Sequence, residues 1–289
     1  MMSRAKLNLA LLVLLIVLAI VMFRVETNSP AGTAIAKLTS LSAAEITKID
    51  YQSRNNEAFV LEQEEGTWWL AQADRRLPAN QFHVDKILAL FFLSSENAYA
   101  LDTSSLEKYG LAEPQARVSA NDYELVFGEL NPLHYQRYVQ LGQQLHLVFD
   151  DVASISMDWT QIIDPTLISA TEKITAISVP NLGNLALVDG RWQMRGQPVS
   201  SVDELNAFHD AWLYARAMKV TMLESIDVDG LAQIVVEFEQ GSVLRLFVLS
   251  NNEEGLVLAN PVLGLVYHFS THQSGTLMSL PVLNGPVGE

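Results

Sequence analysis

The sequence GTWWL at residues 66–70 decides the fold, because a related stretch, GRWQM, stands at residues 190–194. Each begins with a glycine, which is typical of a tight turn, and leads into a short strand that contains tryptophan. Alternating apolar residues precede both stretches, at residues 45–49 and 173–177. Alternation with a period of two is the pattern of a half-buried strand. The repeated order of elements predicts two copies of one structural unit.

A helix is predicted after the tryptophan strand in each copy. Residues 84–90, VDKILAL, align with residues 202–208, VDELNAF. In the second copy Ser201 and Glu204 have the spacing of a capping box, and in the first copy Asn80 is a candidate N-cap. Both segments carry apolar residues at helical spacing, which predicts one buried face for each helix.

A second short helix or turn is predicted to end at a glycine in each copy, Gly110 in the first and Gly230 in the second. Glycine at this place fits the left-handed C-cap of a helix. In the first copy Ser104 and Glu107 have the spacing of another capping box, which predicts where this helix begins.

Three or four short alternating strands then close each copy, and residues 123–127 correspond to residues 243–247. Short strands linked by turns favour antiparallel pairing over βαβ units. We therefore predict an α+β chain in which an N-terminal transmembrane helix precedes two tandem copies of a mainly antiparallel β unit with one or two helices each. The predicted bounds are residues 1–26 for a short cytoplasmic tail and transmembrane signal-anchor, 27–40 for a stalk, 41–155 for the first repeat and 156–289 for the second.

The N-terminal segment has the composition of a membrane anchor. Residues 7–23 are almost wholly apolar, with Arg4 and Lys6 before them and Arg24 after them. At about 1.5 Å of rise per residue, roughly 17 residues span about 26 Å, the short end of a bilayer crossing. A cleaved signal peptide is the alternative, but the run is long for one and no small-x-small site follows it closely. We expect an uncleaved anchor in the inner (plasma) membrane, with the bulk of the chain periplasmic or extracellular.

Composition excludes several classes of function. The 289 residues include 33 acidic and 18 basic side chains, which gives a formal net charge of -15, and no cysteine. The negative charge disfavours nucleic acid as a partner. The absence of cysteine removes thiol catalysis, Fe–S clusters, cysteine-based zinc sites and disulfides.

Motifs of known catalytic chemistry are absent from the sequence, which has no P-loop, Gly-x-Gly-x-x-Gly, Gly-x-Ser-x-Gly or His-Glu-x-x-His. His268 and His272 are four residues apart, but His268 falls in predicted strand, so the pair is not expected to share a metal. His209-Asp210 could activate Ser200 or Ser201 as a nucleophile, but these serines fit better as helix caps.

Two acidic clusters also have a structural explanation. Residues 227–230, DVDG, share part of the pattern of a calcium loop, but Val236 stands where a glutamate would complete the ligand set. Asp150 and Asp151 follow a predicted strand, where a solvated turn explains them better than acid–base chemistry. The sequence therefore predicts no catalytic, cofactor-binding or metal-ligating residue, and no cofactor.

The adjacent tryptophans Trp68 and Trp69 are a candidate binding feature. Successive side chains on a strand point to opposite faces. We expect one ring in the core and the other exposed or at an interface, where it could stack on a sugar or a peptide.

The same residues give the chain a resemblance to a bacterial family, the domain of unknown function numbered 4340. The resemblance rests on GTW at residues 66–68, VD at residues 84–85, and YGL at residues 109–111 with Pro114. The second copy departs from this pattern, with Asp229 for the tyrosine and Ile234 for the proline. The resemblance implies an N-terminal membrane anchor, and some relatives are associated with ABC-type export systems linked to gliding motility. The family has no established catalytic residues, so none is transferred to this chain.

Three functions are compatible with these features. The first is a non-enzymatic, membrane-anchored accessory or scaffold subunit of an envelope complex, with other envelope proteins as partners and no nucleic acid. The second is a module that binds a glycan, peptide or lipid fragment between the two repeats, because domain interfaces often hold pockets. The third is an envelope hydrolase of unrecognised type. The sequence leaves the oligomeric state open.

Overall fold

The computed structural model describes most of the chain after the predicted anchor, namely residues 36–72, 74–95, 98–132, 135–149, 155–169, 171–195, 201–225 and 227–280. The predicted tail and transmembrane anchor at residues 1–26 lie outside the described residues, as does most of the predicted stalk at residues 27–40. Within the described ranges, no helix combines the length and the apolar character that a membrane crossing requires.

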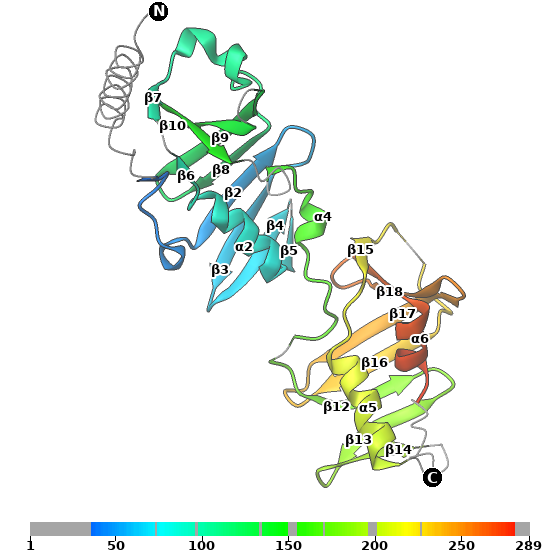
Figure 1. Ribbon diagram of the computed structural model, residues 1–289. Coiled ribbons are helices and arrows are strands. Elements are labelled where there is room, and N and C mark those ends of the chain that lie inside the picture. Colours follow the sequence, from blue (N-terminus) through cyan, green and yellow to red (C-terminus); the bar gives the residue numbers. More distant parts are fainter. Residues whose placement is uncertain are drawn as a thin grey trace, which may run out of the picture.

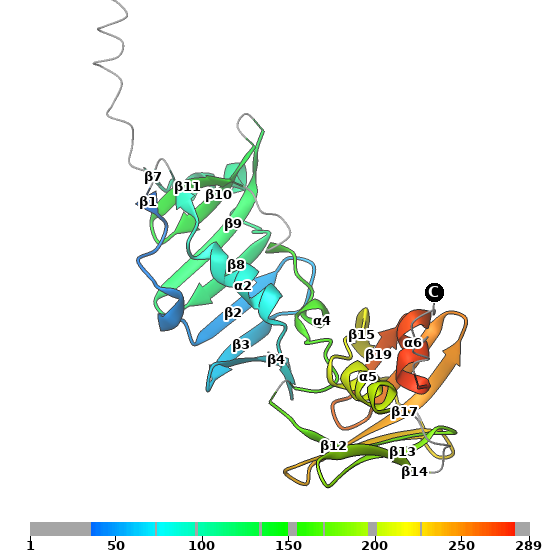
Figure 2. The same cartoon turned by 60° about the horizontal axis from the view of Figure 1, so that its bottom comes forward.

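The described chain forms two antiparallel sheets with few helices, which confirms the predicted α+β class (Figure 1). We call elements β1 to β11 the first unit and elements β12 to α6 the second unit. Residues 155–169, which contain the short helix α4 (Trp159–Ile162), connect them and are called the linker. Figure 2 shows the linker passing between the two units.

The first unit has a nine-stranded sheet in the order β5-β4-β3-β2-β8-β9-β10-β11-β7. Its strands are β2 (Lys48–Ser53), β3 (Phe59–Glu64), β4 (Thr67–Gln72), β5 (Arg75–Pro78), β7 (Ala98–Ala100), β8 (Ala116–Ala120), β9 (Tyr123–Asn131), β10 (Gln136–Leu141) and β11 (Gln144–Phe149). The other elements are a pair of two-residue strands, β1 (Ala36–Lys37) and β6 (Ser94–Ser95), helix α2 (Gln81–Leu90), and the 3₁₀ helices η1 (Ala43–Glu45) and η2 (Thr103–Tyr109).

The second unit has an eight-stranded sheet in the order β14-β13-β12-β16-β17-β18-β19-β15. Its strands are β12 (Ile174–Val179), β13 (Gly183–Val188), β14 (Arg191–Arg195), β15 (Lys219–Met222), β16 (Gln233–Phe238), β17 (Val243–Asn252), β18 (Gly255–Asn260) and β19 (Leu265–Phe269). Helices α5 (Val202–Leu213) and α6 (Thr271–Met278) lie on the same side of this sheet (Figure 2).

The two sheets share one strand order. The series from β4 to β7 across the first sheet corresponds strand by strand to the series from β14 to β15 across the second, and β5 is an additional edge strand of the first. In both units the hairpin that leads into the tryptophan strand, β3–β4 or β13–β14, closes through two residues of positive φ, Glu65-Gly66 and Asp189-Gly190. Such two-residue loops are type I′ turns, whose twist matches that of the flanking strands. The common order and the common turn support the duplication predicted from the sequence.

The predicted N-caps of the main helices are confirmed. The Asn80 side chain accepts a hydrogen bond from the Phe82 amide at 3.2 Å at the start of α2. At the start of α5 the Ser201 hydroxyl accepts one from the Glu204 amide, and the Glu204 carboxylate accepts one from the Ser201 amide. These caps satisfy amides that have no partner within the helix.

The predicted alignment of Val84 with Val202 is wrong. Val84 is fully buried in α2, whereas Val202 is the first residue of α5 and is 65% exposed. When the two N-caps are aligned instead, Val84 corresponds to Leu205 and Phe91 corresponds to Trp212, and all four side chains are buried. The shared Val-Asp letters fall about one turn apart on the two helices, so they are not structural equivalents.

The second predicted helix differs between the units. In the first unit η2 begins at the N-cap Asp102, which accepts a hydrogen bond from the Ser104 amide at 3.0 Å, so the predicted capping box of Ser104 and Glu107 is wrong. The helix ends at Gly110 with φ of +67°, as predicted. In the second unit Gly230 also has a positive φ, but it lies in a turn between β15 and β16.

Each unit has its core between its sheet and its main helix. Fully buried side chains there include Ile49, Leu61, Leu70, Ile87 and Phe91 in the first unit and Ile177, Phe208, Trp212, Leu246 and Leu258 in the second. Burial of each such side chain contributes about 1.5–3 kcal/mol. The Trp212 indole also donates a hydrogen bond to the Leu277 carbonyl at 3.1 Å, which fixes α6 to α5. Each unit is therefore a packed body against which the linker can dock.

Candidate functional site

The linker is held to the first unit by its own backbone. The Met157 amide donates to the buried Tyr51 hydroxyl at 3.1 Å, and the Asn80 amide donates to the Ile162 carbonyl at 2.6 Å. Ile163 then forms an antiparallel bridge with Ala79 at the end of β5. The linker is thus an ordered part of the surface that the first unit presents.

The next residues of the linker pair with the second unit. Thr166 forms an antiparallel bridge with Arg216, the Leu167 amide donates to the Ala215 carbonyl at 3.1 Å, and the Ala217 amide donates to the Pro165 carbonyl at 2.9 Å. Residues 163–167 of the linker are therefore paired with the first unit at one end and with the second unit at the other, and this short segment holds the two units together.

Two clefts border this extended segment. Ile163 and Pro165 line a cleft of about 640 Å³, whereas Asp164 and Thr166 line a cleft of about 900 Å³. Alternate side chains of an extended chain point to opposite sides. The linker therefore separates the two clefts, which we call the smaller cleft and the larger cleft.

The larger cleft is lined mainly by apolar and aromatic side chains, with a few polar groups. From the first unit come Thr67, Trp69, Pro78 and Ala79; from the linker Asp164, Thr166, Leu167, Ile168 and Ser169; and from the rest of the chain Thr171, Glu172, Leu213, Tyr214, Arg216, Leu263 and Tyr267.

Three aromatic side chains of the larger cleft differ in their surroundings. Tyr214 is 76% exposed, and Trp69 is half-buried with the Arg76 guanidinium 4.7 Å from its ring centroid. Burial raises the pKa of Tyr267 to about 12, and the negative charge of Asp164 adds to the rise. Its hydroxyl therefore stays protonated at physiological pH.

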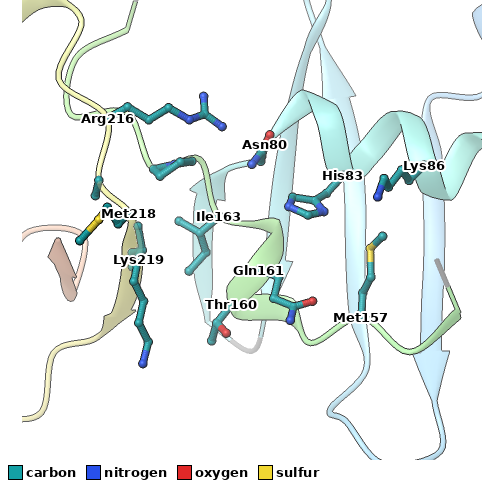
Figure 3. Close-up of a pocket in the computed structure, with 13 residues that line it drawn as sticks. Asn80, His83, Lys86, Met157, Thr160, Gln161, Ile163, Arg216, Met218 and Lys219 are labelled. Carbon is teal, nitrogen blue, oxygen red and sulfur yellow. The ribbon is translucent and has the colours of Figure 1, made fainter. Parts of the chain in front are cut away.

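The smaller cleft has a different chemistry. His83 and Lys86 enter from α2, Thr160 and Gln161 from α4, and Arg216 and Lys219 from the second unit (Figure 3). Burial lowers the pKa of His83, and the positive charges of Lys86 and Arg216 lower it further. The imidazole is consequently neutral near pH 7. The contribution of Arg216 shows that the second unit acts electrostatically on a helix of the first.

The prediction for the adjacent tryptophans is confirmed. Trp68 is buried in the core of the first unit, and Trp69 lines the larger cleft between the units. The alternation of the strand was sufficient to predict this division.

The structure places the remaining candidate residues apart. His268 lies on β19, where its Nε2 is 2.9 Å from the Thr221 hydroxyl, while His272 is exposed on α6. Among the described residues there is no group of three or more His, Asp or Glu side chains able to hold a metal ion. The His209 Nδ1 is 2.9 Å from the Asp210 carboxylate, and Ser201 caps α5.

The acidic candidates behave as turns where the structure describes them. The Asp227 carboxylate accepts a hydrogen bond from the Asp229 amide at 3.0 Å, which is the geometry of an Asx turn before Gly230. Ser200, Asp150 and Asp151 lie outside the described residues.

Sequence reasoning missed the charged residues of the smaller cleft. Lys86 falls within the predicted helix at residues 84–90 without an assigned role, and Arg216 and Lys219 belong to no motif. These residues meet only because the linker docks two units whose contact residues are distant in the sequence. The one available signal was the expectation that a ligand would bind between two repeats.

Comparisons with known proteins add a family but no described function. No curated protein and no solved structure matches the chain. A family model with the description "Domain of unknown function (DUF4340)" matches residues 69–207. The matched region begins at Trp69 and includes α2 and the linker. This match supports the resemblance to the DUF4340 family that the sequence motifs indicated.

Proposed function

We propose that this protein is a membrane-anchored, extracytoplasmic and non-enzymatic accessory subunit of an envelope complex, and that it binds an extended segment of a partner protein in the larger cleft. The observation that carries the proposal is the set of three side chains Trp69, Tyr214 and Arg216 around one cleft at the interface of the units. Tryptophan, tyrosine and arginine are the residue types that contribute most to protein–protein affinity.

The lining supports a peptide segment in particular. Leu213 and Leu263 supply apolar surface, and Asp164 and the neutral Tyr267 hydroxyl supply groups that can pair with backbone amides and carbonyls. A cleft that combines aromatic anchors with a few polar groups suits a chain that must be held in one register.

The predicted anchor would strengthen binding to partners in the same membrane. A helix over residues 7–23 would confine the two units to a thin layer above the membrane. Confinement raises the effective concentration of the cleft near other membrane proteins, so a weak contact is sufficient. The family resemblance makes an ABC-type exporter the first partner to consider.

Site-specific photocrosslinking in the living cell tests the partner. A photoreactive amino acid replaces Tyr214, which is exposed in the larger cleft, and a matched control replaces Tyr135, which is equally exposed elsewhere on the first unit. We expect one discrete crosslinked protein from position 214 and none from position 135. The crosslink should disappear in a Trp69→Ala background, because the aromatic anchor is lost. Equal crosslinking from both positions would contradict the proposal, and a crosslinked glycan would replace the peptide with a sugar.

A pair of reporters tests the predicted orientation separately. A reporter active only outside the cytoplasm is fused after Glu289 and compared with one active only inside. Activity of the first alone is expected. Activity of the second alone would place the units in the cytoplasm and exclude an envelope partner on the outer side.

A further inference from the structure

The smaller cleft concentrates positive charge in an acidic protein. The chain has 33 acidic and 18 basic side chains, yet Lys86, Arg216 and Lys219 all line this cleft. Its lining includes no aspartate or glutamate among the described residues, and none of the three cations forms an ion pair with another described residue. A recess lined by one sign of charge focuses the field and attracts ions of the opposite sign.

The charges approach from both units. Figure 3 shows Lys86 on α2 beside His83, and Arg216 reaching from the second unit toward Asn80 at the start of α2. Lys86 also lies 4.7 Å from the Phe82 ring centroid, which orients its ammonium group. Lys219 extends along the wall formed by the second unit and is an outer cation. An anion between His83, Lys86 and Arg216 would therefore be contacted from two sides.

A histidine and the N-terminus of α2 also border this part of the cleft. The Nδ1 atom of His83 is buried and has no hydrogen-bond partner among the described residues. The first turn of α2 carries no acidic residue, so the positive end of its dipole is not neutralised from within the helix. Arginine and lysine bind phosphate more strongly than they bind neutral acceptors, and arginine does so through paired hydrogen bonds.

Apolar side chains also line the cleft, beside the polar Asn80, Thr160 and Gln161. They are Met157, Ile163, Met218 and Val220, of which Met218 is exposed and the other three are buried. An exposed methionine beside a group of cations suits a ligand that has both a charged and an apolar part. A bare inorganic ion would leave the exposed Met218 side chain uncovered.

We propose that the smaller cleft binds a phosphorylated amphiphilic ligand, with Lys86 and Arg216 on the phosphate and the exposed Met218 on its apolar part. The phosphate comes either from a lipid headgroup or from a soluble phosphorylated compound. The inference does not rest on the peptide site, because a different cleft carries it, although Arg216 lines both clefts.

Calorimetric titration of the full chain in detergent tests the proposal. The probes are inorganic pyrophosphate, short-chain phosphatidylglycerol and, as a neutral control, short-chain phosphatidylcholine. At an ionic strength of about 0.15 M, where exposed charges are screened beyond about 8 Å, we expect saturable binding of the two anionic probes only. We expect phosphatidylglycerol to bind more tightly than pyrophosphate, which would assign the ligand to the membrane. Tighter binding of pyrophosphate would show that the apolar part contributes nothing and would contradict an amphiphilic ligand.

Two charge-matched variants identify the site. The double variant Lys86→Gln with Arg216→Gln removes two cleft cations, and Lys108→Gln with Arg191→Gln removes two exposed cations elsewhere. The first should weaken binding of both anionic probes by at least about tenfold, a change of about 1.4 kcal/mol, and the second by less than about twofold. Equal losses in both variants, or saturable binding of neither probe by the wild-type chain, would overturn the proposal.

A residue-level signal keeps the test independent of variant stability. An anion beside an imidazole favours the protonated form, so pyrophosphate should raise the pKa of His83 in NMR titrations of the wild-type chain. His272, exposed on α6, serves as the internal control and should not respond. A response of both histidines would show non-specific ion binding and contradict the site. The Tyr214 crosslink should persist in Lys86→Gln, so failure of one proposal is distinguishable from failure of the other.

Discussion

Gly110 and Gly230 occupy corresponding positions in the two units, and both have a positive φ, but only one of them has a close neighbour. Gly110 has φ of +67°, and a Cβ built on it would lie 2.7 Å from the Glu129 backbone nitrogen, because η2 packs directly on β9. Gly230 has φ of +82°, but a Cβ there would meet nothing within 4 Å. The two units thus share a positive φ at this position, and only the first has a close contact there. A shared motif therefore does not imply a shared constraint on substitution.

The starts of the main helices differ in a similar way. The first turn of α5 carries Asp203 and Glu204, whereas the first turn of α2 carries no acidic residue. Acidic side chains stabilise a helix N-terminus by about 0.3–1 kcal/mol. The helix that borders the smaller cleft is the one without them. The equivalent helix of the second unit, α5, carries acidic side chains at its own N-terminus.

The largest expected effect compares the equivalent core residues of the two helices. Phe91→Ala and Trp212→Ala should each lower the free energy of unfolding by about 3–5 kcal/mol, because each removes a fully buried ring. Amide hydrogen exchange measures the loss separately in β8–β9 and in β16–β17. We expect each variant to deprotect mainly its own sheet. Equal deprotection of both sheets by either variant would mean that the units unfold as one body.

The next effect tests the glycine comparison directly. Gly110→Ala should destabilise the chain by more than about 2 kcal/mol, because a left-handed backbone and a steric contact both oppose the methyl group. Gly230→Ala should cost only about 1 kcal/mol from the backbone alone. Urea unfolding of the two variants measures the difference. Similar costs would show that η2 does not constrain Gly110.

A smaller effect concerns the helix starts, and it should have opposite signs in two assays. Asn80→Asp keeps the N-cap of α2 and adds a negative charge, so thermal unfolding should show a gain of up to about 1 kcal/mol. The same charge borders the smaller cleft and should weaken pyrophosphate binding. The Ser201→Asp variant is the control and should leave pyrophosphate binding unchanged. Weaker pyrophosphate binding in both Asn80→Asp and Ser201→Asp would contradict the conclusion that only the start of α2 borders the anion site.

The smallest effect at neutral pH concerns a buried histidine of the first unit. His146 on β11 has no hydrogen-bond partner on either ring nitrogen among the described residues, and burial lowers its pKa. The unfolded chain, with a histidine pKa near 6.5, therefore binds more protons than the folded chain as the pH falls below about 6.5, and stability is lost in that range. His146→Leu should change stability little at pH 7 and should reduce the loss between about pH 6.5 and pH 5.

The control for this prediction lies in the second unit. His268 also has a lowered pKa, from burial and from the charge of Lys219, but its Nε2 is paired with the Thr221 hydroxyl. Acid unfolding followed at β18–β19 should be the same in His146→Leu and in the wild-type chain. An unchanged acid response of β10–β11 in the variant would exclude His146 as its cause.

Much of the fold followed from short-range patterns in the sequence. The two hairpin turns were predictable because a glycine before a tryptophan strand marks the loop, and the helix N-caps because Asn80 and Ser201 precede apolar periodicity. The alignment of Val84 with Val202 failed because letter identity says nothing of helix phase. The N-cap of η2 was missed because Asp102 and Ser104 can both cap a helix and the sequence does not rank them.

The candidate site was predictable only in outline. Trp69 could be assigned to an interface because strand alternation divides it from Trp68. The meeting of Lys86 with Arg216 depends on how the linker pairs with Ala79 on one side and Arg216 on the other. Such pairing is a tertiary contact between residues distant in the sequence, so local sequence patterns do not predict it.

Arg216 lines both clefts, and this position has a thermodynamic consequence. The two proposals together predict that a guanidinium bound to a phosphate in one cleft is unavailable to a peptide in the other, so we expect the two ligands to be antagonists. Linkage makes the antagonism reciprocal, since each ligand reduces the affinity of the other by the same factor. We therefore expect the concentration of the phosphorylated ligand to set, through Arg216, how tightly the proposed partner peptide binds.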